Sequence, residues 1–77
     1  KRNICFELTK DEFMKFWNKS CYYCKTNIEG IGLDRINSKI GYKIDNVVSC
    51  CWMCNRMKLD LDFKDFIDRC KKIASIF

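Results

Sequence analysis

The cysteines constrain this chain more than any other feature of its sequence. The 77 residues hold seven of them, at positions 5, 21, 24, 50, 51, 54 and 70. Four of the seven make two C-x-x-C motifs, and 26 residues separate one motif from the other. A C-x-x-C turn presents two thiolates at the spacing that a tetrahedral metal accepts, and two such turns complete a four-cysteine site. The pattern therefore predicts a structural Zn²⁺ ion bound by Cys21, Cys24, Cys51 and Cys54.

A disulfide framework in a secreted protein is the alternative interpretation of these cysteines. The odd cysteine count and the paired spacing argue against it, and the segment Lys1–Glu7 lacks the apolar stretch of a signal peptide. We therefore expect a protein of a reducing, intracellular compartment. Cys50 competes with Cys51 as the third ligand, and the C-x-x-C spacing favours Cys51. Cys5 and Cys70 are expected to be small apolar core residues.

Length and composition limit the remaining possibilities. We expect residues 1–77 to form a single domain, because the chain has no proline and no Gly/Ser-rich linker. A domain this small buries only about 60% of the surface of its unfolded chain. It usually needs a further stabilising element, such as a bound metal or a disulfide. No apolar run approaches the ~20 residues of a membrane span. The net charge of +5 favours an anionic partner, and the absence of histidine removes the commonest general base.

Two helices are predicted at the ends of the chain. Thr9 and Glu12 form a capping box that opens a helix over residues 9–18. Asp62 occupies the equivalent N-cap position of a second helix over residues 62–75. This second helix carries an apolar stripe at near-helical spacing, which predicts a core-facing side, at Phe63, Phe66, Ile67, Cys70, Ile73 and Phe77.

The middle of the chain predicts a hairpin followed by a short helix. We expect a strand over residues 31–36, a turn over 37–41 and a return strand over 45–49. The second C-x-x-C then opens a helix that runs to Lys58. This order of zinc knuckle, hairpin and ligand-bearing helix is typical of a treble-clef finger, so the predicted fold class is a small, zinc-stapled α+β domain.

Four segments together resemble a known family. They are Gly32-Leu33-Asp34-Arg35-Ile36, Gly41-Tyr42, Asp45-Asn46-Val47-Val48 and Cys51-Trp52-Met53-Cys54-Asn55-Arg56-Met57-Lys58. In this order they resemble the HNH endonuclease family, whose ββα-metal core here covers residues 21–58. Phage, viral and mobile-element members of that family carry a four-cysteine zinc site. Helices often flank the family's core, as the two predicted terminal helices do here.

The resemblance implies roles for individual residues. In the family, the first strand ends in Asp-His, where the aspartate binds a catalytic divalent cation and the histidine activates water. Asp34 matches that aspartate, whereas Arg35 replaces the histidine. Asn46 matches the asparagine that braces the loop. Asn55 matches the third signature residue and would complete, with Asp34, a site for Mg²⁺ or Mn²⁺.

The function implied by the resemblance is metal-dependent hydrolysis of phosphodiester bonds in duplex DNA. The expected catalytic residues are Asp34, Arg35, Asn46 and Asn55, and the expected nucleic-acid contacts are Arg35, Lys43, Arg56 and Lys58. Arginine stays protonated in proteins, so Arg35 cannot act as a base, but it can bind a phosphate bidentately. A lost general base costs about 10²–10⁴-fold, which need not abolish cleavage.

The alternative is a catalytically silent zinc module that binds nucleic acid or docks a protein partner. Each implied residue also has a structural interpretation. Asp34 could pair with the neighbours of Arg35 or cap a turn, and Asn46 could be a simple turn residue. Asn55 could hydrogen-bond a cysteine sulfur. The lysines could lie on ordinary solvated helix faces.

Overall fold

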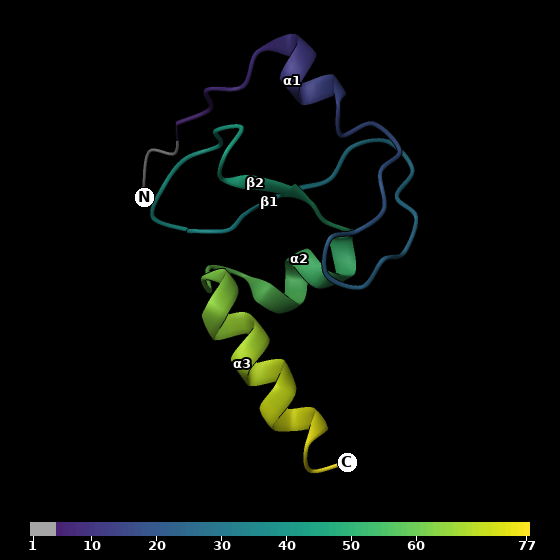
Figure 1. Cartoon of the computed structure of the whole chain (residues 1–77), viewed down its shortest axis with the longest axis vertical. Helices are drawn as coiled ribbons and strands as arrows, with labels where there is room; N and C mark the ends of the chain where they lie inside the picture. The colour runs from purple at the N-terminus through teal and green to yellow at the C-terminus, as the bar shows by residue number, and fades with distance from the viewer. Residues whose placement is uncertain (1–4) are drawn as a thin grey trace.

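A computed structural model describes residues 5–77, so part of the segment in which we looked for a signal peptide lies outside the described residues. The elements in chain order are α1 (Lys10–Met14), β1 (Leu33–Arg35), β2 (Val47–Ser49), α2 (Trp52–Lys58) and α3 (Phe63–Ala74). Figure 1 shows the two strands at the centre, with α1 on one side and α2 and α3 on the other. The predicted small α+β class is confirmed.

The hairpin pairs β1 with β2 in antiparallel register. Asp34 lies opposite Val48, and Arg35 lies opposite Val47. Along β1 only Asp34 is buried, because alternate side chains of a strand point to opposite faces. Both strands are shorter than the predicted ranges of 31–36 and 45–49. A carboxylate thus occupies the inward position of β1, where an apolar residue would be expected.

Asn46 explains why the second strand begins late. Its side-chain amide donates to the carbonyl oxygens of Asn37, Ile40 and Gly41, at 3.1, 3.3 and 3.0 Å. Its Oδ1 accepts the backbone N–H of Asn37 at 3.0 Å. The residue is 6% exposed. One side chain therefore satisfies four backbone groups of the loop and fixes its shape, which a simple turn residue would not do.

Helix α1 begins as predicted and ends earlier. Thr9 and Glu12 make both hydrogen bonds of the capping box, at 2.9 and 3.1 Å. After Met14 the chain continues in tighter turns, and Asn18 ends them with a left-handed φ of 53°. Asn18 and Gly30 exchange hydrogen bonds of 2.8 and 2.7 Å, which hold this turn to the segment before β1.

Helix α3 is attached through its N-terminal end. Asp62 is the N-cap residue, but its side chain makes no cap hydrogen bond. Its Oδ1 instead accepts the N–H and the hydroxyl of Ser38, both at 3.0 Å. The N–H of Phe63 donates to the carbonyl of Ile36 at 2.9 Å. The predicted N-cap position is correct, whereas the role of its carboxylate is to hold the hairpin loop.

The predicted apolar stripe of α3 is only partly buried. Phe66 is buried at 5% exposure and meets the ring of Tyr23 edge-on, with centroids 5.3 Å apart. Ile73 is 53% exposed and Phe77 fully exposed. Figure 1 shows why: α3 runs away from the sheet toward the C terminus. The prediction that the whole stripe is core is therefore wrong for its C-terminal part.

The core is small and unusually polar. Its buried apolar members are Cys21, Val47, Cys50, Cys54 and Phe66, and its buried polar members are Asp34, Ser38, Asn46, Ser49 and Lys58. Cys5 is exposed, so its predicted place in the core is wrong, while Cys70 is half-buried. Buried polar groups are unfavourable unless they are paired, so this core depends on the partners of its polar groups.

Candidate metal centre

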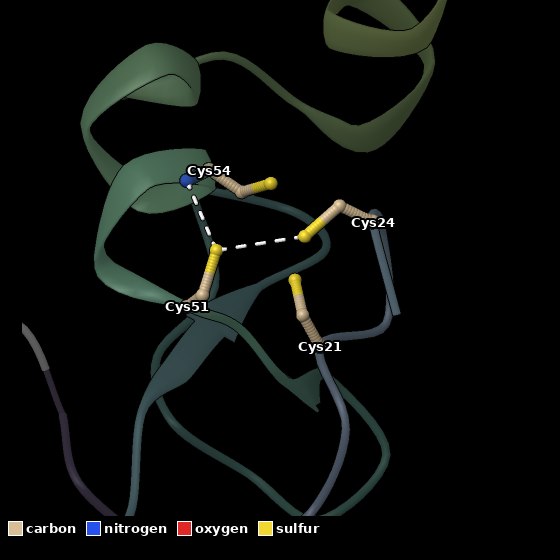
Figure 2. Close-up of side chains that lie close together, drawn as sticks. All are labelled: Cys21, Cys24, Cys51 and Cys54. Carbon is tan, nitrogen blue, oxygen red and sulfur yellow. Dashed lines mark hydrogen bonds between the residues drawn. The ribbon is translucent and has the colours of Figure 1, made fainter. Parts of the chain in front are cut away.

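The four cysteines of the two C-x-x-C motifs converge on one point. Their sulfur atoms all lie within 4.8 Å of one another. Figure 2 shows Cys21 and Cys24 approaching from the first knuckle, and Cys51 and Cys54 from the start of α2. The sulfurs of Cys24 and Cys51 are 3.7 Å apart. Zn–S bonds near 2.3 Å place the sulfurs of a tetrahedral site about 3.8 Å apart, so the cluster fits a single metal ion.

Local backbone geometry holds each pair in place. In the first knuckle the N–H of Lys25 donates to the carbonyl of Cys21 at 2.9 Å, and Lys25 has a left-handed φ of 68°. In the second, Cys51 is the N-cap of α2, and its sulfur accepts the N–H of Cys54 at 3.4 Å. Both ligand pairs are therefore positioned by tight turns that the C-x-x-C spacing itself favours.

The hairpin and the second knuckle approach closely at a glycine. The N–H of Cys50 donates to the carbonyl of Gly32 at 2.9 Å. A Cβ atom at position 32 would overlap the carbonyl oxygen of Cys50. Glycine is thus required here because the backbone leading into β1 packs directly against the backbone leading into Cys51.

The thiols of the cluster differ in acidity. Burial acts to raise the pKa of Cys21, but backbone N–H groups of Cys24, Cys51 and Tyr23 outweigh it and lower that pKa to about 6. Burial, then hydrogen bonds to the neighbouring sulfurs, raise the pKa of Cys54. Thiolates this close repel one another. The thiol of Cys21 therefore loses its proton readily, whereas the thiol of Cys54 keeps its proton. A bound divalent cation removes that conflict and ionises all four.

Cys50 lies beside the cluster without joining it. The four clustered residues include Cys51, the residue that the C-x-x-C spacing favours, and they exclude Cys50. Cys50 is 1% exposed, and burial raises the pKa of its thiol to about 12. It is therefore a neutral, apolar packing residue next to the ligands. No disulfide joins any of the seven cysteines.

Asp34 is enclosed by two partners. Its Oδ2 accepts the phenolic hydrogen of Tyr23 at 2.6 Å and lies 3.2 Å from the Nζ of Lys58. The side chains of Lys58 and Asp34 are 1% and 6% exposed. Burial, followed by the hydrogen bond to Asp34, raises the pKa of Tyr23, so its hydroxyl stays protonated. Asp34 is thus a buried, paired carboxylate.

The divalent cation implied for Asp34 does not fit this arrangement. Asn55 is exposed on α2, whereas Asp34 is buried on β1. The ammonium of Lys58 already lies 3.2 Å from Oδ2 of Asp34 and places a positive charge beside that oxygen.

The side chain of Arg35 forms hydrogen bonds to the backbone of the hairpin loop. Its guanidinium donates to the carbonyls of Ser38 and Ile40, at 2.7 and 3.4 Å. It also lies over the ring of Tyr42, 5.3 Å from the centroid. The residue is half-buried. Arg35 therefore stabilises the same loop that Asn46 braces.

Of the predicted nucleic-acid contacts, Lys43 and Arg56 are exposed and Lys58 is not. The guanidinium of Arg56 lies over the indole of Trp52, 5.6 Å from the ring, and Trp52 is 65% exposed. The N–H of Asn55 donates to the carbonyl of Cys51 at 3.0 Å within the helix. A direct phosphate contact by Lys58 would require breaking its ion pair with Asp34.

Sequence reasoning missed Tyr23 and the true position of Lys58. The signal for Lys58 was available: it follows the cluster cysteine Cys54 by four residues, which places both on the same helix face. No comparable signal singles out Tyr23, because its contact with Asp34 depends on how the knuckle packs against the hairpin.

Comparison with known proteins gives one viral relative. "Uncharacterized protein R423" of Acanthamoeba polyphaga mimivirus is 43% identical over 79 residues, an alignment that covers all of this chain. The chain spans about 15% of the length of that protein. No protein-family model matches the chain, and no solved structure matches it. The likeness to HNH proteins therefore rests on the sequence segments given above. None of the helices within residues 5–77 has the length and apolar character to cross a membrane.

Proposed function

We propose that this chain is a zinc-stapled, treble-clef module of HNH type that binds nucleic acid without cleaving it. The four-sulfur cluster supports the zinc, and the order of knuckle, hairpin and ligand-bearing helix supports the treble clef. The observation that carries the choice of binding over cleavage is the enclosure of Asp34 by Lys58 and Tyr23. A carboxylate already neutralised by a buried ammonium has little affinity left for a catalytic cation.

The nucleic-acid partner is supported by charge and by the surface of α2. The chain carries a net charge of +5. Helix α2 presents Arg56 stacked on the exposed Trp52, directly beside the metal cluster, and Lys43 is exposed on the hairpin loop. Cations bind phosphates, and an exposed indole stacks on bases. Duplex DNA is the partner that the HNH resemblance favours.

Endonuclease activity is the second candidate, and Asn46 is the observation that favours it. Its four hydrogen bonds to the loop backbone are the bracing role that the resemblance assigns to this asparagine. The hydrogen bonds of Asn46 are therefore consistent with an HNH-type loop. The position of the family's catalytic histidine is occupied by Arg35.

Binding is tested by titrating labelled duplex DNA at several salt concentrations. We expect affinity to fall steeply with salt, and Arg56→Ala or Lys43→Ala to reduce the salt slope by about one unit each. Lys64→Ala is the matched control, because Lys64 is exposed on α3 and paired with Asp68. Affinity that does not change with salt, or that cannot be detected, would favour a protein-docking module instead.

Cleavage is tested on supercoiled plasmid with Mg²⁺ or Mn²⁺. We expect the parent protein to bind the plasmid and leave it intact. Nicking by the parent that is absent from an Asp34→Ala variant shown to be folded by circular dichroism would establish the endonuclease in place of the binding module. Arg35→His restores the family's base and shows whether the missing histidine alone explains inactivity.

A further inference from the structure

We infer that the ammonium of Lys58 is the resident cation of the Asp34 site and that it excludes a divalent ion from it. The HNH resemblance assigns a divalent cation to this carboxylate, and the residues present do not accommodate one. The inference rests on the same aspartate as the proposed function, but it concerns metal binding alone and is tested without nucleic acid.

The contacts of Lys58 are those of a bound cation. Its Nζ lies 3.2 Å from the carboxylate of Asp34 and donates to the backbone carbonyl of Arg35 at 2.9 Å. Carboxylate and carbonyl oxygens are also the ligands that Mg²⁺ and Mn²⁺ prefer. One anionic and one neutral oxygen therefore converge on a positive charge that the chain itself supplies.

Burial makes this arrangement permanent in the folded protein. Lys58 is among the most buried side chains of residues 5–77, at 1% exposure. A buried charged carboxylate is strongly unfavourable without a neutralising partner, so the ammonium of Lys58 stabilises Asp34. If Lys58 turned away to solvent, the carboxylate would keep the neutral hydroxyl of Tyr23 but lose its compensating charge. Because the ammonium of Lys58 is part of the chain, it stays beside Asp34 and competes with a divalent ion at every concentration of that ion.

Removal of Lys58 should therefore create a metal site. Lys58→Ala removes the charge and leaves room beside Asp34 for an ion with its water ligands. We expect the zinc-loaded variant to bind one Mn²⁺ per chain at least tenfold more tightly than the parent. At a Mn²⁺ concentration about 100 times its Kd, we expect the Tm of the variant to rise by at least about 10 °C.

The experiment counts bound Mn²⁺ by the loss of the free-ion signal in electron paramagnetic resonance and follows Tm in parallel. The double variant Asp34→Asn/Lys58→Ala is the control, and we expect it to bind no Mn²⁺. The inference is overturned if the parent binds a Mn²⁺ ion that Asp34→Asn loses. It is equally overturned if Lys58→Ala gains neither Mn²⁺ nor stability. A Lys58→Ala variant that stays unfolded at all Mn²⁺ concentrations also overturns it, because the divalent ion then fails to replace the ammonium.

Discussion

The Nζ of Lys58 lies 3.2 Å from the Oδ2 of Asp34, and both side chains are almost completely buried. This ion pair joins the last turn of α2 to the middle of β1, and the hydroxyl of Tyr23 adds a second contact, from the first knuckle. Three separate segments of a small domain thus meet at one carboxylate. The same contacts that leave Asp34 unavailable to a metal also contribute to folding.

The first prediction concerns the stability of this ion pair. Lys58→Met and Asp34→Asn should each lower the free energy of unfolding by about 3–5 kcal/mol, because each leaves a buried group without its partner. The double variant should cost clearly less than the sum of the two single changes. Urea unfolding of the four proteins measures this coupling. Strictly additive losses would show that the two groups do not interact in solution.

The metal ligands and their helix could be predicted because the signals are local. A C-x-x-C motif fixes two sulfurs within one turn, and Cys51 then caps the helix that carries Cys54. The capping box of Thr9 and Glu12 is equally local and was equally predictable. Each sulfur pair and each cap therefore depends on contacts within four residues along the chain, and the meeting of the two pairs follows from the preference of a metal for four ligands.

Contacts between distant segments account for what the sequence did not reveal. Helix α1 is short because the turn after it is held by Asn18, which bonds to Gly30. The carboxylate of Asp62 turns from its own helix to Ser38, 24 residues away. The amphipathic pattern of α3 predicted the helix correctly. It did not indicate how much of the apolar stripe packs against the rest of the domain.

Removal of zinc should unfold the chain. The apolar core is too small to hold the fold, and structural zinc contributes about 10–16 kcal/mol in comparable small sites. A strong chelator, or Cys24→Ser, should abolish the cooperative thermal transition followed by circular dichroism. Cys50→Ala is the matched control, since Cys50 is buried beside the cluster but is not one of its ligands. It should keep one zinc per chain, and a chelated parent that still melts cooperatively would contradict the prediction.

Replacement of Gly32 by alanine should weaken zinc binding. The added Cβ would overlap the carbonyl of Cys50 and displace the backbone that leads into Cys51. We expect a lower Tm and faster zinc loss to a chelator. Gly30→Ala is the control for the general cost of replacing a glycine. Gly30 has a φ of 82°, and an added Cβ would meet open space. Gly30→Ala should therefore lower the stability without accelerating zinc loss. Equal rates of zinc loss in both variants would contradict the role of the close approach.

Asp62 should contribute stability that disappears in acid. The backbone N–H of Ser38, then its hydroxyl, lower the pKa of Asp62 from the ordinary value of 3.8. The carboxylate therefore stabilises the fold fully above pH 3.8, and this contribution is lost as the pH falls through the lower, folded-state pKa. Asp62→Asn should lower Tm by a constant amount from pH 7 to about pH 5. The difference from the parent should begin to shrink as the pH falls toward 3.8. It is followed down to the lowest pH at which both proteins still hold zinc and melt cooperatively, and a difference that grows toward acid would contradict the assignment.

Trp52 should contribute directly to nucleic-acid affinity. It is 65% exposed, it follows Cys51 of the four-cysteine cluster, and Arg56 lies over its ring. An indole held on a rigid helix beside a cation can stack on an unpaired base, a contact that contributes about 1–3 kcal/mol. Trp52→Ala should therefore weaken binding of single-stranded DNA about 5–150-fold in fluorescence polarisation, with a smaller loss for duplex. Trp17→Ala is the matched control, because Trp17 is 56% exposed and lies just after α1. Equal losses from the two substitutions would show that the effect is not specific to the surface beside the metal centre.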